Sequence, residues 1–69
     1  MNAPIVRLTL IEEGVRQPAV YLTFRADEQV GVRELCTLAV LSVRAADISL
    51  CRHTVLMSGR AFRVLNVLH

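Results

Sequence analysis

Residues 26–47, ADEQVGVRELCTLAVLSVRAAD, decide the fold class that this sequence predicts. Their apolar side chains recur at the i, i+3, i+4 and i+7 spacing of one helical face. Asp27 suits the N-cap of such a helix, and Glu28 suits its first turn, where the helix dipole favours an acidic side chain. Gly31 favours a later start. We therefore expect one amphipathic helix, with an apolar stripe formed by Val32, Leu35, Cys36, Ala39, Val43 and Ala46.

The segment before this stretch has the period of a β-hairpin. Residues 5–13 (IVRLTLIEE) and 19–25 (AVYLTFR) alternate between apolar and polar side chains, which is typical of half-buried strands. Residues 12–18 (EEGVRQP) form the expected turn, and Pro18 suits the first position of a strand or an edge because it lacks an N–H. The predicted inner face carries Val6, Leu8, Leu10, Val20, Leu22 and Phe24.

The last third of the chain predicts a second hairpin about Ser58 and Gly59, because Gly in a two-residue loop between apolar runs is a hairpin signal. The competing interpretation is a second helix from Asp47 to about Met57. In the hairpin, the uncharged face holds Cys51, His53, Val55, Met57, Phe62, Val64, Asn66 and Leu68. The other face holds Arg52, Thr54, Leu56, Arg63, Leu65 and Val67.

These elements predict a single α+β domain over residues 1–69, ordered ββαββ, with one helix packed on an antiparallel sheet. The alternative order is ββαα. A domain of this size buries only about 60% of the surface that its unfolded chain exposes, yet 54% of its residues are hydrophobic. We therefore expect a second chain to cover part of the apolar surface, and we predict a homodimer.

The predicted helix carries a second apolar seam, since Leu38 and Leu41 fall among the charged positions Arg33 and Arg44. A twofold axis lets one such patch serve both chains. The burial of two leucines from each chain need not outweigh the free-energy cost of association. The predicted interaction surface therefore also includes side chains from the second hairpin, namely Leu56, Leu65 and Val67.

Cys51 and His53 are the residues that most resemble a chemical site. A structural zinc site needs four ligands, and this chain lacks the CxxC or HxxxH spacing that would supply them. A catalytic thiolate needs a base beside it in a cleft, whereas two neighbours at i and i+2 project in parallel from a strand. We expect no metal, no cofactor and no enzymatic activity. His53 is predicted to be buried and hydrogen-bonded to a neighbour such as Asn66.

Charge and hydropathy restrict the partners. All eight basic residues are Arg, but the net charge is only +2, which is weak for a protein that must neutralise several phosphates. The rival to a protein partner is nucleic acid, bound by Arg7, Tyr21 and Arg25 on the outer face of the first hairpin. No apolar run reaches the roughly 20 residues of a membrane span, so no membrane partner is expected.

The N-terminal segment MNAPIVRL lacks the pattern of an export signal, and two cysteines make no disulfide framework. We expect a cytoplasmic protein with free thiols. Size, the lack of catalytic residues and the excess of apolar surface together predict a protein-interaction module. Such a module would bind or inhibit another protein, as the compact accessory proteins of phages and plasmids do.

Overall fold

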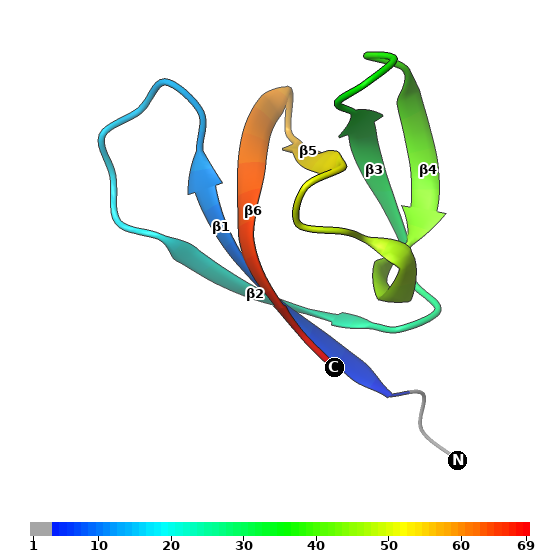
Figure 1. Ribbon diagram of the computed structural model, residues 1–69. Helices are drawn as coiled ribbons and strands as arrows, with labels where there is room; N and C mark the ends of the chain where they lie inside the picture. Colours follow the sequence, from blue (N-terminus) through cyan, green and yellow to red (C-terminus); the bar gives the residue numbers. More distant parts are fainter. Residues whose placement is uncertain (1–3) are drawn as a thin grey trace.

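The computed structural model describes residues 4–69, so residues 1–3 of the segment MNAPIVRL lie outside the described part (Figure 1). Six strands and one short 3₁₀ turn lie within residues 4–69. Their bounds are β1 Ile5–Glu12, β2 Val20–Arg25, β3 Gln29–Glu34, β4 Val40–Arg44, η1 Ala45–Asp47, β5 His53–Met57 and β6 Arg60–Leu68.

All six strands belong to one antiparallel sheet in the order β2-β1-β6-β5-β3-β4. The connection from β2 to β3 forces this sheet to curl. In a flat sheet these two strands would lie about 19 Å apart, since four strand spacings of about 4.8 Å separate them. Only residues 26–28 join them, and the Glu28 N–H donates to the Arg25 carbonyl across 3.0 Å. The sheet is therefore rolled, and β2 reaches η1 (Figure 1).

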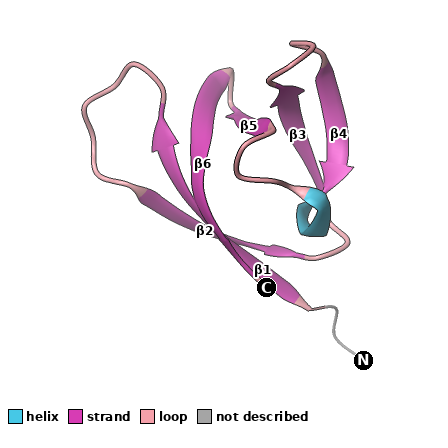
Figure 2. Ribbon diagram, viewed as in Figure 1, coloured by secondary structure: helices cyan, strands magenta, loops and turns pink. Residues whose placement is uncertain are grey.

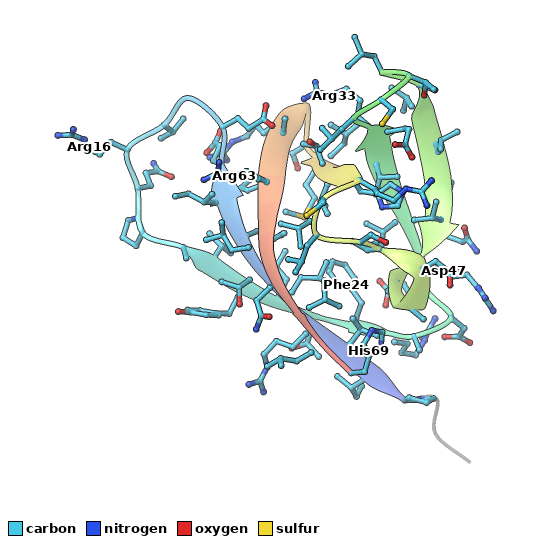
Figure 3. All side chains as sticks on the ribbon, in the orientation of Figure 1. Arg16, Phe24, Arg33, Asp47, Arg63 and His69 are labelled. Carbon is cyan, nitrogen blue, oxygen red and sulfur yellow. The ribbon has the colours of Figure 1, made fainter. Side chains whose placement is uncertain are left out.

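The concave face of the rolled sheet, called the inner face below, holds the core. Its centre is made by alternate residues of β1, which are fully buried, and by their neighbours on β3, β5 and β6. Ala45 and Ile48, in and just after η1, complete the core, and Phe24 packs against it from β2 (Figure 3). The buried apolar residues are Val6, Leu8, Leu10, Val30, Val32, Ala45, Ile48, Val55, Phe62 and Val64.

The predicted helix over residues 26–47 is wrong, and so is the ββαββ order. Residues 4–69 contain no α-helix, and the stretch instead forms the β3–β4 hairpin followed by η1 (Figure 2). Two strands with a period of two, joined by a short turn, produced spacings that match a helical stripe. Valine at positions 30, 32, 40 and 43 favours strands because branching at Cβ restricts χ1. Pairing of β3 with β5, which is distant in sequence, then fixes the strand.

Both predicted hairpins are confirmed. β1 pairs with β2, and β5 pairs with β6 across a two-residue turn, in which Ser58 and Gly59 have φ of 51° and 75°. Positive φ at both positions is the signature of a type I′ turn, whose twist suits a hairpin. The alternative ββαα order is therefore also wrong, because residues 53–57 are a strand.

The predicted faces of the second hairpin hold only in part. Val55 lies opposite Phe62 on the inner face, as expected. Cys51 precedes β5 and is exposed, so it does not share the inner face. In β6 the register shifts, because Thr9 pairs with Asn66 whereas Leu10 pairs with Val64. Leu65 is thus the extra residue of a β-bulge, which reverses the facing of every residue after it.

After the bulge, Val67 packs against the core, while Asn66 and Leu68 are exposed. The prediction had these three residues the other way round.

Candidate functional site

The open edge of β4 is the feature that most resembles a binding site. No strand within residues 4–69 pairs with the side of β4 that faces away from β3. The Ala45 N–H donates to the Glu28 carbonyl across 2.8 Å, and the Glu34 N–H donates to the Ala39 carbonyl across 2.8 Å. Since hydrogen-bonded pairs alternate along an antiparallel ladder, the N–H and C=O groups of Val40, Ser42 and Arg44 point outward. We call these groups the β4 edge.

Apolar side chains surround the β4 edge. Val40 is 70% exposed, Leu38 66% and Leu41 43%, and Leu35 in the same turn is also exposed. Leu38 has a φ of 61°, an unusual left-handed conformation for a residue with a branched side chain. Backbone strain of this kind is concentrated at functional positions. An edge with free backbone groups and apolar neighbours is a template for another strand.

The other edge of the sheet, at β2, is protected at one end. The Ala26 N–H donates to the Pro4 carbonyl, so the backbone groups of Tyr21, Thr23 and Arg25 point outward. Glu28 satisfies both groups of Arg25, since its Oε1 accepts the Arg25 N–H at 3.2 Å and its own N–H donates to the Arg25 carbonyl. Only a short stretch of β2 therefore remains free to pair. The β4 edge is therefore the one more available for pairing with another strand.

The structure divides the predicted interaction residues into three places. Leu38 lies in the β3–β4 turn and Leu41 and Arg44 lie on β4, so these three surround the β4 edge. Arg33 and Leu56 lie on the outer, convex face of the sheet, and Leu65 is exposed at the bulge. Val67 packs against the core and is not available for contact. The sequence prediction missed Val40 and Ser42, which only a strand assignment for residues 40–44 would have revealed.

An arginine row crosses the outer face of the sheet. Arg63 lies opposite Thr54 on β5, and Thr54 lies opposite Arg33 on β3 (Figure 3). A Glu13 carboxylate oxygen lies 3.3 Å from the Arg33 guanidinium, and the Thr54 hydroxyl donates to the other oxygen across 3.5 Å. A shallow pocket of about 350 Å³ adjoins the row beside Gly14. Glu13 therefore neutralises the charge of Arg33 in this row.

The structure places the two residues of the Cys51–His53 motif in different surroundings, because Cys51 is exposed and His53 is buried. His53 is buried as predicted, but its partner is the Ser49 backbone, whose N–H donates to Nδ1 across 3.1 Å, and not Asn66. The other ring nitrogen, Nε2, lies 3.7 Å from a Glu34 carboxylate oxygen. Nδ1 is thus not free to act as a base towards the exposed Cys51 thiol. Within residues 4–69, no group of three or more His, Cys, Asp or Glu side chains is placed to hold a metal ion.

A second polar contact lies at one mouth of the rolled sheet. The Arg60 guanidinium donates to both carboxylate oxygens of Glu12 and lies 5.6 Å from the centre of the Phe62 ring. The hydrogen bond from Arg60 holds the pKa of Glu12 below its ordinary value, although desolvation opposes this shift. An apolar pocket of about 340 Å³ opens beside the pair, lined in part by Leu22 and Met57. The Glu12–Arg60 pair thus lies at the edge of the core, next to Phe62.

The residues predicted to contact nucleic acid do lie on one face. Register places Arg25 opposite Ile5 and Tyr21 opposite Thr9, so Arg7, Tyr21 and Arg25 share the outer face of the first hairpin. Tyr21 is 69% exposed. Arg25, however, forms an ion pair with Asp27 at 3.3 Å, which reduces the charge available for phosphate.

Comparisons of this chain with protein-family models, with curated proteins and with solved structures found no match. Among residues 4–69, no helix has the length and apolar character needed to cross a membrane.

Proposed function

We propose that this chain is a small, non-enzymatic protein-interaction module, which docks a β-strand of another polypeptide at the β4 edge. The observation that carries the proposal is the set of outward N–H and C=O groups at Val40, Ser42 and Arg44, in a setting of exposed apolar side chains. Strand addition draws its affinity from such main-chain groups and its specificity from the alternate side chains.

The contrast between the two edges supports this proposal. Proteins commonly protect sheet edges with charges, proline, bulges or covering loops. In β2, Glu28 caps the backbone of Arg25. In β4, the only charged side chain is Arg44, which Asp47 neutralises across 3.0 Å. The chain protects part of its β2 edge but not its β4 edge. A partner strand that covers the β4 edge explains this difference.

Where the docked strand belongs to a different protein, the module acts as an accessory or inhibitory subunit of that protein. The exposed thiols of Cys36 and Cys51, which are both free, favour a reducing, cytoplasmic environment.

Two matched proline variants test the proposal. The N–H groups of Ser42 and Thr23 both point outward from an edge, so Ser42→Pro and Thr23→Pro each remove a free donor without removing a ladder hydrogen bond. Wild type and both variants serve as tagged baits in an extract of the source cells, with captured proteins quantified by mass spectrometry. We expect wild type and Thr23→Pro to retain a stoichiometric protein that Ser42→Pro loses.

Nuclease treatment of the same extract distinguishes a protein partner from the alternative function, nucleic-acid binding. A protein partner held at the β4 edge survives this treatment. If nuclease treatment abolishes the capture of proteins by the bait, the alternative of nucleic-acid binding through Arg7, Tyr21 and Arg25 is favoured. If Ser42→Pro captures the same proteins as wild type in the same amounts, the β4 edge is not the docking site and the proposal fails.

A further inference from the structure

We infer that the strand docked at the β4 edge belongs to a second copy of this chain, with the two β4 strands antiparallel about a twofold axis at Ser42. This inference rests on the proposed function, because it names the occupant of the same edge. The contact joins the two sheets into one continuous sheet across the axis.

The hydrogen-bonding pattern selects this register. With Ser42 opposite Ser42 of the second copy, Val40 lies opposite Arg44 and all five residues of each β4 are paired. The outward N–H and C=O groups of Val40, Ser42 and Arg44 then all lie opposite outward groups of the second copy. This arrangement gives three hydrogen-bonded residue pairs, called narrow pairs here, each of which exchanges two hydrogen bonds. An axis at Leu41 or Val43 leaves only two narrow pairs within the strands. The central register thus satisfies the most backbone groups.

The side chains are also self-complementary in this register. On the inner face, the exposed side chain of Leu41 meets Val43 of the second copy. On the outer face, Val40 meets the aliphatic stem of Arg44 of the second copy. No like charges lie opposite each other, and each Arg44 is already neutralised by its own Asp47. An axis at Arg44 would instead set two guanidinium groups face to face, which is unfavourable.

The two edges together explain why pairing would stop at two copies. A twofold contact uses the same edge of both chains, so it consumes the β4 edge of each. What remains outside the pair is the β2 edge, where Glu28 caps Arg25. A closed dimer is therefore expected, and not an open fibre of sheets. The contact involves only five residues from each chain, so the association belongs to the weak class of small interfaces.

Cysteine cross-linking tests the register. In a background of Cys36→Ser and Cys51→Ser, Ser42→Cys should form an intermolecular disulfide with oxidised glutathione as the oxidant. Its two Cα atoms would be about 5.5 Å apart, within the range of a disulfide. Val40→Cys alone is the matched control and should not cross-link, whereas a mixture of Val40→Cys and Arg44→Cys proteins should. Cross-linking by Val40→Cys alone, at the rate of Ser42→Cys, would overturn this register.

Sedimentation equilibrium of the purified proteins tests whether a second copy of the chain occupies the β4 edge. From about 10 µM to about 500 µM, wild type and Thr23→Pro should show a reversible monomer–dimer equilibrium. Ser42→Pro should keep the wild-type circular dichroism spectrum and associate at least about 10-fold more weakly. A dimer of unchanged affinity in Ser42→Pro would overturn the inference.

The two proposals fail in different ways. A wild-type monomer at every concentration, combined with Ser42-dependent capture of a different protein from the extract, would refute the second copy and leave strand docking at the β4 edge intact. A monomer without any Ser42-dependent capture would refute both.

Discussion

Replacing Val67 with aspartate should destabilise the protein far more than the same change at Leu68, although simple alternation along β6 predicts the opposite. The bulge at Leu65 sets this difference. It places Val67 opposite Leu8, which is fully buried, whereas Leu68 is 51% exposed. The two substitutions therefore compare neighbouring positions that face opposite sides of the sheet.

The size of the effect follows from burial. Full burial of a valine side chain contributes about 1.5–3 kcal/mol, so the half-buried Val67 contributes about 1 kcal/mol. A carboxylate set against Leu8 adds roughly 1–3 kcal/mol, because it loses water without gaining a partner. Val67→Asp should therefore cost about 2–4 kcal/mol. A chain of 69 residues has a total stability of only about 3.5–10 kcal/mol, so much of the stability is lost.

Urea unfolding followed by far-ultraviolet circular dichroism measures both variants. At a slope of ~1.5 kcal/mol per molar urea, a loss of about 3 kcal/mol lowers the midpoint by about 2 M. Leu68→Asp should stay within about 0.5 kcal/mol of wild type, as exposed positions usually do. Equal losses at the two positions, or a larger loss for Leu68→Asp, would show that β6 is not bulged at Leu65.

Three further changes test other parts of the structure. Ser58→Asn should stabilise the protein by about 0.5 kcal/mol in urea unfolding, because asparagine tolerates the left-handed conformation better than serine; a loss of stability would argue against the type I′ turn. Glu12→Gln should reduce the acid sensitivity of the urea midpoint. The hydrogen bond from Arg60 lowers the pKa of Glu12 from 4.5, so its stabilising contribution is complete above pH 4.5 and is lost as the pH falls further; equal acid sensitivity in the two proteins would contradict this. His53→Leu should cost about 1–3 kcal/mol, because the Ser49 N–H loses its acceptor; a neutral result would mean that water replaces the ring.

Local pattern was sufficient to predict the β1–β2 and β5–β6 hairpins. Along the first part of β1, the buried residues Val6, Leu8 and Leu10 alternate with less buried ones, so a period of two predicts both the strand and its inner face. The glycine at position 59 predicts the turn between β5 and β6, because the positive φ that this turn needs suits glycine. The burial of His53 was also predictable from its neighbours Val55 and Met57, although its partner at Ser49 was not.

The middle of the chain was decided by contacts that no local window contains. Residues 26–47 carry an apolar spacing that fits a helix as well as two short strands. The pairing of Val32 with Val55 settles the choice in favour of strands, because β3 gains a neighbour from a distant part of the chain. Leu38 and Leu41 are exposed, but they surround a sheet edge and not the helical seam that the sequence predicted.

The β4 edge and the bulge belong to the tertiary structure alone. Which strand lies last in a sheet depends on the order of all six strands, and no residue within β4 specifies that order. The bulge at Leu65 likewise lies just beyond the part of β6 that pairs with β5, where β6 continues along β1 alone. Side-chain alternation is a local property of the sequence. The pairing of backbone groups, which determines both the free edge and the facing of Val67, is a property of the whole sheet.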